Sequence, residues 1–200
     1  PISGRDALLI TQLAFFDDPE RFTRELNSLC DELEVRVAKG EGAAPRGAPR
    51  ILVSGTPMAL PFWKLHHLVE TAGAVIVAEE TCTGTRYFSG MVAEDGRTVD
   101  EQLRNIAQRF TKVNCACFTP NSERLTDVLR LARETKADGV IYFSLQFCQP
   151  FALEGRRVEK ALEGEGIPVL RLESDYSAED SGQLKTRIEA FLEMIAGQKA

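Results

Sequence analysis

The feature that most constrains this fold is the apolar run Val75 to Ala78, which ends in Glu79-Glu80-Thr81-Cys82-Thr83-Gly84. A short β-branched run closed by a glycine turn is typical of a buried strand in a parallel sheet. Open α/β sheets bind their ligands beyond the carboxyl ends of their strands. We therefore expect Cys82 to lie at the functional edge of a sheet.

Two further cysteine segments follow the same pattern. The apolar run Gly139 to Leu145 predicts a second buried strand, and Cys148 follows three residues later. Between these strands, Cys115 and Cys117 precede a helix that Asn121 can cap. Because Cys115 and Cys117 are two residues apart, an extended segment would point both thiols the same way. If the strands are parallel neighbours, four thiols converge on one rim.

Four short apolar runs alternate with helical patterns, which is typical of a parallel sheet covered by helices on both faces. The expected strands are residues 51–55, 74–78, 139–145 and 168–172. Ahead of them, residues 1–40 carry two helical patterns and form an expected helical arm, the end of a preceding domain. Residues 41–49 lack periodicity and predict a linker, so the sheet domain is expected to span residues 50–200.

Composition narrows the class of protein. A chain of 200 residues with 44% hydrophobic residues fits one globular domain with a full core. The formal net charge is −6 and no basic block occurs, so nucleic acid is not an expected partner. No run approaches the roughly 18 apolar residues of a membrane span, and no signal-peptide pattern opens the chain. We expect a cytoplasmic protein without a membrane partner, and, since the chain starts at Pro1, a piece of a longer one.

Five cysteines are an odd count for a disulfide framework, so metal or redox chemistry is the better hypothesis. Cys30 adjoins the apolar face of a helix in the arm, and we expect it to be plain core. The other four could be reduced structural thiols, or ligands of zinc or an iron–sulfur cluster, which both favour thiolates. His66 and His67 are adjacent on one helix, where we expect them solvated or half-buried and unable to share an ion.

The strand ends offer further candidate residues. Glu79 and Glu80 could position a substrate hydroxyl or orient Arg86, or they could cap a helix or lie in a solvated turn. Arg86 itself could lie in a surface turn or contact a negatively charged cluster or substrate. The segment Gly55-Thr56-Pro57 could hold a phosphate, although it lacks the spaced glycines of nucleotide-binding loops.

Five segments are distinctive in combination: Gly55-Thr56-Pro57-Met58, Glu79-Glu80-Thr81-Cys82-Thr83-Gly84, Cys115-Ala116-Cys117-Phe118-Thr119-Pro120-Asn121, Gln146-Phe147-Cys148-Gln149-Pro150 and Arg187-Ile188-Glu189-Ala190-Phe191-Leu192-Glu193. Together they resemble the carboxyl-terminal half of the 2-hydroxyacyl-CoA dehydratase and benzoyl-CoA reductase family, which includes 2-hydroxyglutaryl-CoA dehydratase component D and a double-cubane cluster branch. The likeness covers nearly the whole chain.

The resemblance implies an oxygen-sensitive iron–sulfur cluster, [4Fe-4S] or double-cubane, held between two flavodoxin-like (Rossmann-like) domains. This chain would be the second domain, and an amino-terminal half would share the cluster. Cys148 matches the carboxyl-terminal cluster ligand of the dehydratase subunits. Cys82, Cys115 and Cys117 match positions characteristic of the double-cubane branch. Some relatives carry a cysteine after the first strand, where this chain has Thr56, so the cluster type stays open.

The chemistry implied by the resemblance is a single-electron step. A separate ATP-hydrolysing iron–sulfur activator passes an electron at low potential to the cluster. In the dehydratases, the thioester carbonyl of a bound 2-hydroxyacyl-CoA is reduced to a ketyl radical anion, and the 2-hydroxyl leaves as water; the double-cubane relatives resemble reductases of small molecules. Little water around a cluster lowers its potential, which the apolar Phe118, Phe147 and Phe151 would suit, although such aromatics are also ordinary core residues.

Two other classes of function remain as alternatives. One is a non-catalytic α/β module that binds a partner or nucleotide and keeps its thiols reduced. The other is a thiol–disulfide enzyme, but Cys115 and Cys117 lack the usual two-residue spacer. Under the leading hypothesis, the protein works as a homo- or heterodimer, and the isolated domain is inactive because half of the cluster ligands would be absent.

Overall fold

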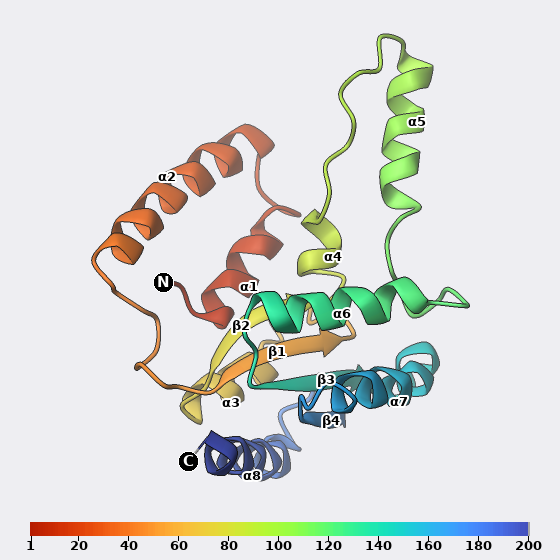
Figure 1. The fold of residues 1–200 in the computed structure, drawn as a ribbon. Coiled ribbons are helices and arrows are strands. Elements are labelled where there is room, and N and C mark those ends of the chain that lie inside the picture. Colours follow the sequence, from red (N-terminus) through yellow and green to blue (C-terminus); the bar gives the residue numbers. More distant parts are fainter. Residues whose placement is uncertain (200) are drawn as a thin grey trace.

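The computed structural model describes residues 1–199. Its elements in chain order are α1 (Gly4–Leu13), α2 (Pro19–Ala38), β1 (Arg50–Gly55), α3 (Lys64–Thr71), β2 (Val75–Glu80), α4 (Thr85–Phe88), α5 (Val99–Phe110), α6 (Ser122–Glu134), β3 (Gly139–Leu145), α7 (Gln149–Glu163), β4 (Val169–Ser174) and α8 (Ser181–Lys199). All four expected strands form, and Figure 1 shows helices on either side of their sheet. Within the described residues, no helix has both the length and the apolar character needed to cross a membrane.

The four strands are all parallel and lie in the order β2-β1-β3-β4. Ser54 of β1 pairs with Glu80 on one side and with Tyr142 on the other, so β1 and β2 end within one residue of each other, and β3 runs two residues beyond the partner of Gly55. The chain leaves β1 toward β2 and then returns to place β3 on the other side of β1. This reversal makes the carboxyl ends of β1 and β3 the topological switch point, where ligands of such sheets bind.

Helices cover both faces of the sheet, which confirms the flavodoxin-like α/β prediction. One apolar core lies under α3 and α8 and includes Ile51 and Val53 of β1. The second lies under α6 and α7 and includes Leu52 of the same strand. Neighbouring residues of a strand point to opposite faces, so β1 contributes to both cores.

The strand β2 is not fully buried, contrary to the prediction. It lies at the edge of the sheet, where Val75 and Val77 stay partly exposed while Ile76 is buried. Strand order depends on contacts between distant segments, which an apolar run does not encode. The β-branched composition therefore predicted a strand correctly but not its place in the sheet.

The helix α1 packs on the sheet domain, although its residues were assigned to the helical arm. Gly4 lies so close to β2 that an added Cβ would stand 2.4 Å from the Cβ of Ile76. The buried Gln12 accepts a hydrogen bond from the Leu60 backbone N–H at 2.8 Å. The irregular segment 41–49 follows α2, as expected of a linker. The boundary at residue 50 between arm and domain stays a prediction.

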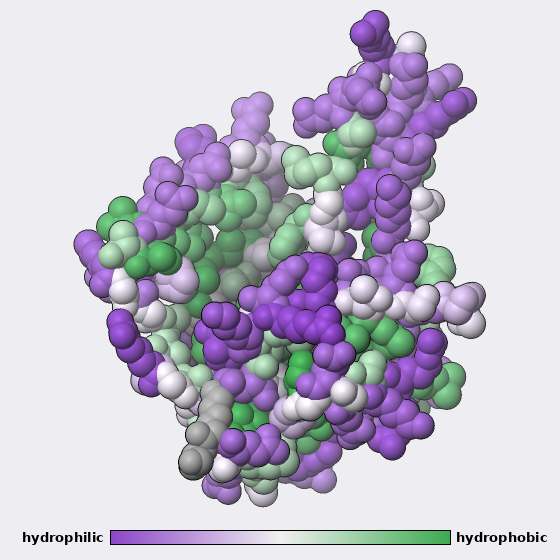
Figure 2. All heavy atoms as spheres, in the orientation of Figure 1, coloured by the Kyte–Doolittle hydropathy of each residue, from purple (hydrophilic) through white to green (hydrophobic). Residues whose placement is uncertain are grey.

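The helix α2 begins as its sequence predicts, with Asp18 capping the Arg21 N–H at 2.9 Å and Pro19 in the first turn. None of its residues is buried, and Cys30 is exposed, so the expectation that Cys30 is core is wrong. The apolar stripe of α2 does not reach either core. Figure 1 shows α2 apart from the sheet, and Figure 2 shows apolar side chains gathered on its inner side.

Candidate functional site

Four of the five cysteines lie on loops at the carboxyl end of the sheet, and we call them the cysteine rim: Cys82, Cys115, Cys117 and Cys148. Cys82 lies in the turn that follows β2, and Cys148 lies just past β3 as the residue before α7. Cys115 and Cys117 lie in the loop that leads to α6. The strands β2 and β3 flank β1 instead of pairing directly, but the same edge of the sheet carries all three loops.

The thiols of the rim influence one another electrostatically. The pKa of Cys117 is raised, first by its hydrogen bond with Cys115 and further by the Cys148 and Cys82 thiols. Burial raises the pKa of Cys82, the Arg86 charge opposes this, and the Cys115 thiol adds to it. Bound cations would relieve this mutual repulsion of thiolates. No three His, Cys, Asp or Glu side chains in residues 1–199 are spaced to hold a single ion.

Cys115 and Cys117 come together through a turn and not through an extended segment. The Phe118 N–H donates to the Cys115 carbonyl at 3.1 Å, which closes this turn. Asn121 occupies the position before α6, as predicted, but its side chain makes no capping bond. Its Nδ2 instead donates to the Cys115 carbonyl at 2.7 Å and to Glu154 Oε1 at 3.0 Å. Asn121 therefore links the Cys115 loop to α7 instead of capping α6.

A buried charge network lies beneath the rim, and we define it as Glu80, Arg86, Arg124 and Glu154. The Arg124 side chain is fully buried, with Nη2 3.1 Å from Glu80 Oε2 and Nη1 in contact with Glu154. Glu80 also accepts a 2.6 Å hydrogen bond from the hydroxyl of Ser54. Two arginines and two glutamates balance, so the network is formally neutral.

Arg86 belongs to this network and does not lie in a surface turn, one of the two predicted alternatives. Its side chain is 6% exposed, and its Nη2 donates to the Gly55 carbonyl at 2.5 Å. Its Nε lies 3.0 Å from Glu80 Oε1, at an angle that makes no hydrogen bond. Glu80 thus holds Arg86 in place, while Nη1 of Arg86 has no partner among residues 1–199. Helix capping and a solvated turn are excluded for Glu80.

The arginines of the network stay ionised although they are buried. Burial alone would lower the pKa of Arg124, but Glu80 holds that pKa above its ordinary value, so the guanidinium stays ionised. Both arginines lie over the ring of Phe151, with Cζ 5.2 Å from its centroid for Arg86 and 4.9 Å for Arg124. Such cation–π contacts strengthen where water is excluded.

Only one of the three aromatics near the rim is shielded. Phe151 is buried, whereas Phe118 is 55% exposed and Phe147 is 90% exposed. The expectation that Phe118 and Phe147 keep water away therefore fails for this chain alone. Loop residues at a strand end can face either way, and the sequence does not distinguish the two directions.

Glu79 and His66 pair with each other beside the rim. His66 is fully buried, which corrects the expectation of a solvated or half-buried ring, and its Nε2 lies 2.9 Å from Glu79 Oε2. The Thr81 hydroxyl donates to the other oxygen of Glu79 at 2.5 Å. His67 is exposed. Glu79 is therefore engaged by neighbouring side chains, and the two histidines do not converge.

The loop after β1 is used for internal contacts. Thr56 is buried, its N–H donates to the Phe143 carbonyl at 2.9 Å, and its hydroxyl accepts from the Leu145 N–H at 3.2 Å. These bonds tie the end of β1 to β3. They leave the Thr56 N–H and hydroxyl engaged, so the structure does not support a phosphate site there.

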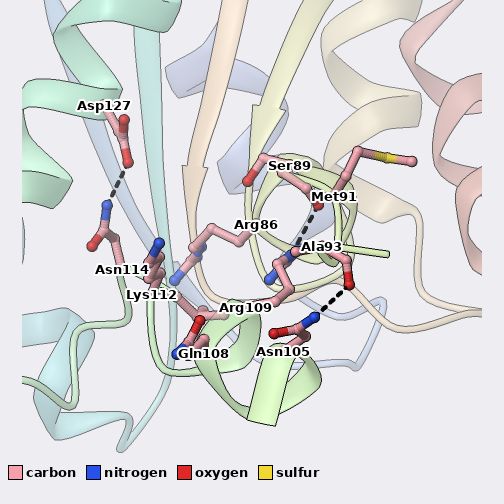
Figure 3. Close-up of a pocket in the computed structure, with 12 residues that line it drawn as sticks. Arg86, Ser89, Met91, Ala93, Asn105, Gln108, Arg109, Lys112, Asn114 and Asp127 are labelled. Carbon is pink, nitrogen blue, oxygen red and sulfur yellow. Dashed lines mark hydrogen bonds between the residues drawn. The ribbon is translucent and has the colours of Figure 1, made fainter. Parts of the chain in front are cut away.

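A pocket of about 240 Å³ lies beside Arg86, between the loop after α4, the helix α5 and the segment before α6. Figure 3 shows Arg86, Arg109 and Lys112 around it. The one acidic side chain in its lining, Asp127, accepts a 2.5 Å hydrogen bond from Asn114. The excess of cationic side chains favours a small anionic ligand.

Sequence reasoning missed Arg124 and Glu154, although a pattern marks both. Arg124 shares the buried face of α6 with Val128 and Ala132, at helical spacing. Glu154 lies within the buried face of α7, between Phe151 and Val158. A charge inside an apolar stripe predicts a buried partner of opposite sign, because an unpaired ion there is costly.

The family model described as 2-hydroxyglutaryl-CoA dehydratase, D-component, matches residues 1–195 of this chain. The chain belongs to this family. The D-component match thus confirms the resemblance that the five distinctive segments indicated.

Three relatives of this D-component chain carry names of dehydratase subunits, one of them as a putative subunit. The putative dehydratase subunit YjiM of Escherichia coli (strain K12) is 33% identical over 196 residues, which cover 97% of this chain and 50% of the relative. The beta subunit of (R)-2-hydroxyglutaryl-CoA dehydratase from Acidaminococcus fermentans is 29% identical, over 98% of this chain and 50% of the relative. The (R)-phenyllactyl-CoA dehydratase beta subunit of Clostridium sporogenes is 25% identical, over 93% of this chain and 47% of the relative. The chain spans about half the length of these relatives.

Proposed function

We propose that this chain is the carboxyl-terminal cluster-binding half of a 2-hydroxyacyl-CoA dehydratase-like enzyme. Cys82, Cys115, Cys117 and Cys148 would supply thiolate ligands to an iron–sulfur cluster. The observation that carries this proposal is the gathering of four free thiols at the switch-point end of the sheet, in a member of a dehydratase component family. When bound, such a cluster would supply single-electron reduction at low potential.

The residues present fit a cluster better than a single ion. Four soft thiolate donors suit iron and sulfide. Bound cations would offset the repulsion from neighbouring thiols, which adds to the Cys115 hydrogen bond in raising the pKa of Cys117 and to burial in raising the pKa of Cys82. The unpartnered, buried Nη1 of Arg86 lies four residues after Cys82 and could donate to an acceptor at the rim. Hydrogen bonds to cluster sulfurs are one means by which proteins set a reduction potential.

The chain's own residues would hold and shield this site. The thiolates would bind, Arg86 would offset negative charge beside Cys82, and Phe151 would exclude water on the inner side. The outer side stays open, because Cys117, Phe118 and Phe147 are exposed. We infer that an amino-terminal half of the same protein covers them and shares the cluster.

The proposal includes partners. Two of the relatives are named beta subunits, which supports a second subunit, in a homo- or heterodimer. The electron donor would be an ATP-hydrolysing iron–sulfur activator, and the substrate an acyl-CoA. The cationic pocket beside Arg86 suits an anionic substrate group. Free thiols are typical of a reducing compartment, so we place the protein in the cytoplasm.

A second candidate is a small-molecule reductase with a double-cubane cluster. The feature that favours it is the presence of four cysteines, including the paired Cys115 and Cys117, at the rim of one chain. In either case we propose Glu79, Glu80 and Arg86 as the candidate catalytic residues. Glu80 and Arg86 are buried, so we expect them to hold the site in shape. Glu79 is partly exposed and is therefore the better placed of the three to contact a substrate.

The test is anaerobic purification of the full-length protein, with iron and acid-labile sulfide analysis and Mössbauer spectroscopy. We expect roughly four iron atoms per [4Fe-4S] cluster, or about twice that for a double cubane. Turnover of a 2-hydroxyacyl-CoA with the reduced activator would separate the dehydratase from the reductase. Less than about one iron atom per chain would favour a non-catalytic binding module instead.

A further inference from the structure

We propose that Arg124 is a positioning residue for the cysteine rim. This proposal rests on the function proposed above. The Arg124 guanidinium contacts carboxylates from two elements that carry cysteines of the rim at their ends, β2 and α7. Nε and Nη2 lie 3.3 and 3.1 Å from the two oxygens of Glu80, and Nη1 contacts Glu154. Arg124 thereby fixes the distance between the end of β2 and the helix α7.

Each carboxylate partner of Arg124 lies close to a cysteine along the chain. Glu80 ends β2 two residues before Cys82. Glu154 lies in α7, which starts directly after Cys148, and the Ala152 N–H donates to the Cys148 carbonyl at 3.0 Å. A movement of either carboxylate would therefore move a thiol.

The third loop is connected through Asn121, the residue directly before the helix that carries Arg124. Its Nδ2 donates both to Glu154 Oε1 at 3.0 Å and to the Cys115 carbonyl at 2.7 Å. Arg124, Glu154 and Asn121 thus connect all three cysteine loops through side chains that are at most 7% exposed. No loop of the rim is positioned only by its own backbone.

Buried ion pairs are weak evidence for stability, because desolvation offsets their attraction. In some proteins they specify geometry instead, and we infer this role here because a bidentate contact requires the planar guanidinium. Lysine would keep the charge but could not bridge Glu80 and Glu154 in the same way. Arg124→Lys is therefore the variant that separates geometry from charge.

The experiment uses the full-length protein with Arg124→Lys and, as the matched control on the same helix, Arg130→Lys. Arg130 is exposed and pairs only with the neighbouring Asp127 and Glu134 among the contacts described. Two readouts are taken: loss of iron from the reconstituted cluster to a chelator, and cross-linking of the cluster-free thiols by a short bifunctional reagent, mapped by mass spectrometry. Thermal unfolding of each variant is measured alongside.

We expect Arg124→Lys to lose iron about tenfold faster or more, the size typical of residues that orient metal ligands. We also expect it to lose cross-links between Cys82 and Cys148, because Arg124 holds Glu80 and Glu154 together, while Arg130→Lys matches the wild type in both readouts. If Arg124→Lys unfolds, Asn121→Ala takes its place, and it should loosen Cys115 while the cross-link of Cys82 to Cys148 persists.

A wild-type cross-linking pattern and cluster lifetime in Arg124→Lys, with only a lower unfolding temperature, would overturn the positioning role. The same holds for Asn121→Ala if its cross-links are unchanged. If the wild-type protein itself takes up no iron, the cluster proposal fails, and the cross-linking arm still decides whether Arg124 positions the thiols.

Discussion

Gly55 and Phe143 pack backbone against backbone at the switch point. A Cβ built on Gly55 would stand 1.9 Å from the Phe143 carbonyl oxygen, and the φ of Gly55 is +133°. The Gly55 carbonyl also accepts a hydrogen bond from the Arg86 guanidinium at 2.5 Å. Position 55 therefore requires a residue without a side chain, because the backbone of β3 lies against it and its carbonyl accepts the hydrogen bond from Arg86.

We predict that Gly55→Ala destabilises the protein by about 1–3 kcal/mol from backbone strain alone, with the steric clash adding to this. Urea unfolding measures the free energy. The control is Gly182→Ala in α8, where an added Cβ meets no atom within 4 Å and the higher helix propensity of alanine should stabilise slightly. Equal unfolding midpoints for both variants and the wild type would contradict the steric account.

Removing one carboxylate from the charge network should be costly. We predict that Glu154→Ala lowers the free energy of unfolding by about 3–5 kcal/mol, because Arg124 loses one of its two buried partners. The control is Glu163→Ala at the exposed end of the same helix, for which we expect a change within about 0.5 kcal/mol. Similar losses in the two variants would show that Glu154 is not a buried partner of Arg124.

Stability should fall at acid pH partly through Asp180. Burial alone would raise the pKa of Asp180, but hydrogen bonds from Lys64 and Ser174, both at 2.5 Å, hold that pKa below its ordinary value. The carboxylate therefore stabilises the fold above about pH 4, and this contribution is lost as the pH falls through the folded-state pKa. We predict that the free energy of unfolding of Asp180→Asn, measured in urea from pH 7 downward, falls less steeply with decreasing pH than that of the wild type. An equally steep fall in the variant would assign the acid sensitivity to other groups.

The thiols should differ in reactivity in the cluster-free protein. Alkylation requires the thiolate, and burial raises the pKa of the half-buried Cys82. We predict that iodoacetamide modifies Cys82 more slowly than the exposed Cys30 at neutral pH, and that the rate at Cys82 keeps rising as the pH is raised. Mass spectrometry of timed samples measures both rates. Faster modification of Cys82 than of Cys30 at neutral pH would contradict its placement.

Local patterns predicted the elements of this fold well, because strands and helices follow short-range periodicity. The run Gly139–Leu145 forms β3 with the predicted bounds, and Cys82 and Cys148 lie past their strands as expected. The position of β2 at the sheet edge was not predicted, since an apolar run does not specify which strand lies beside it. The exposure of Cys30 was missed for a similar reason: an apolar stripe predicts a helix face, not what covers it.

The buried side chains that hold the cysteine rim in place were the hardest part of the structure to predict from the sequence. Arg124 and Glu154 come from helices on either side of β3 in the sequence and meet only in the fold. Asn121 was predicted as a cap, in which its side-chain oxygen would accept from a helix N–H. Its Nδ2 instead donates to the Cys115 carbonyl and to Glu154, two acceptors that only the fold brings to it. Such choices depend on tertiary contacts, and a single sequence shows only that a charge interrupts an apolar face.

The most direct test of the central claim is the iron and sulfide content of single Cys→Ser variants, reconstituted anaerobically in the full-length protein. If the cysteine rim binds one cluster, serine at Cys82 or Cys148 should remove most of the iron and sulfide and alter the electron paramagnetic resonance spectrum. Cys30→Ser, remote on α2, should match the wild type. Full iron and an unchanged spectrum in all of the rim variants would contradict the account.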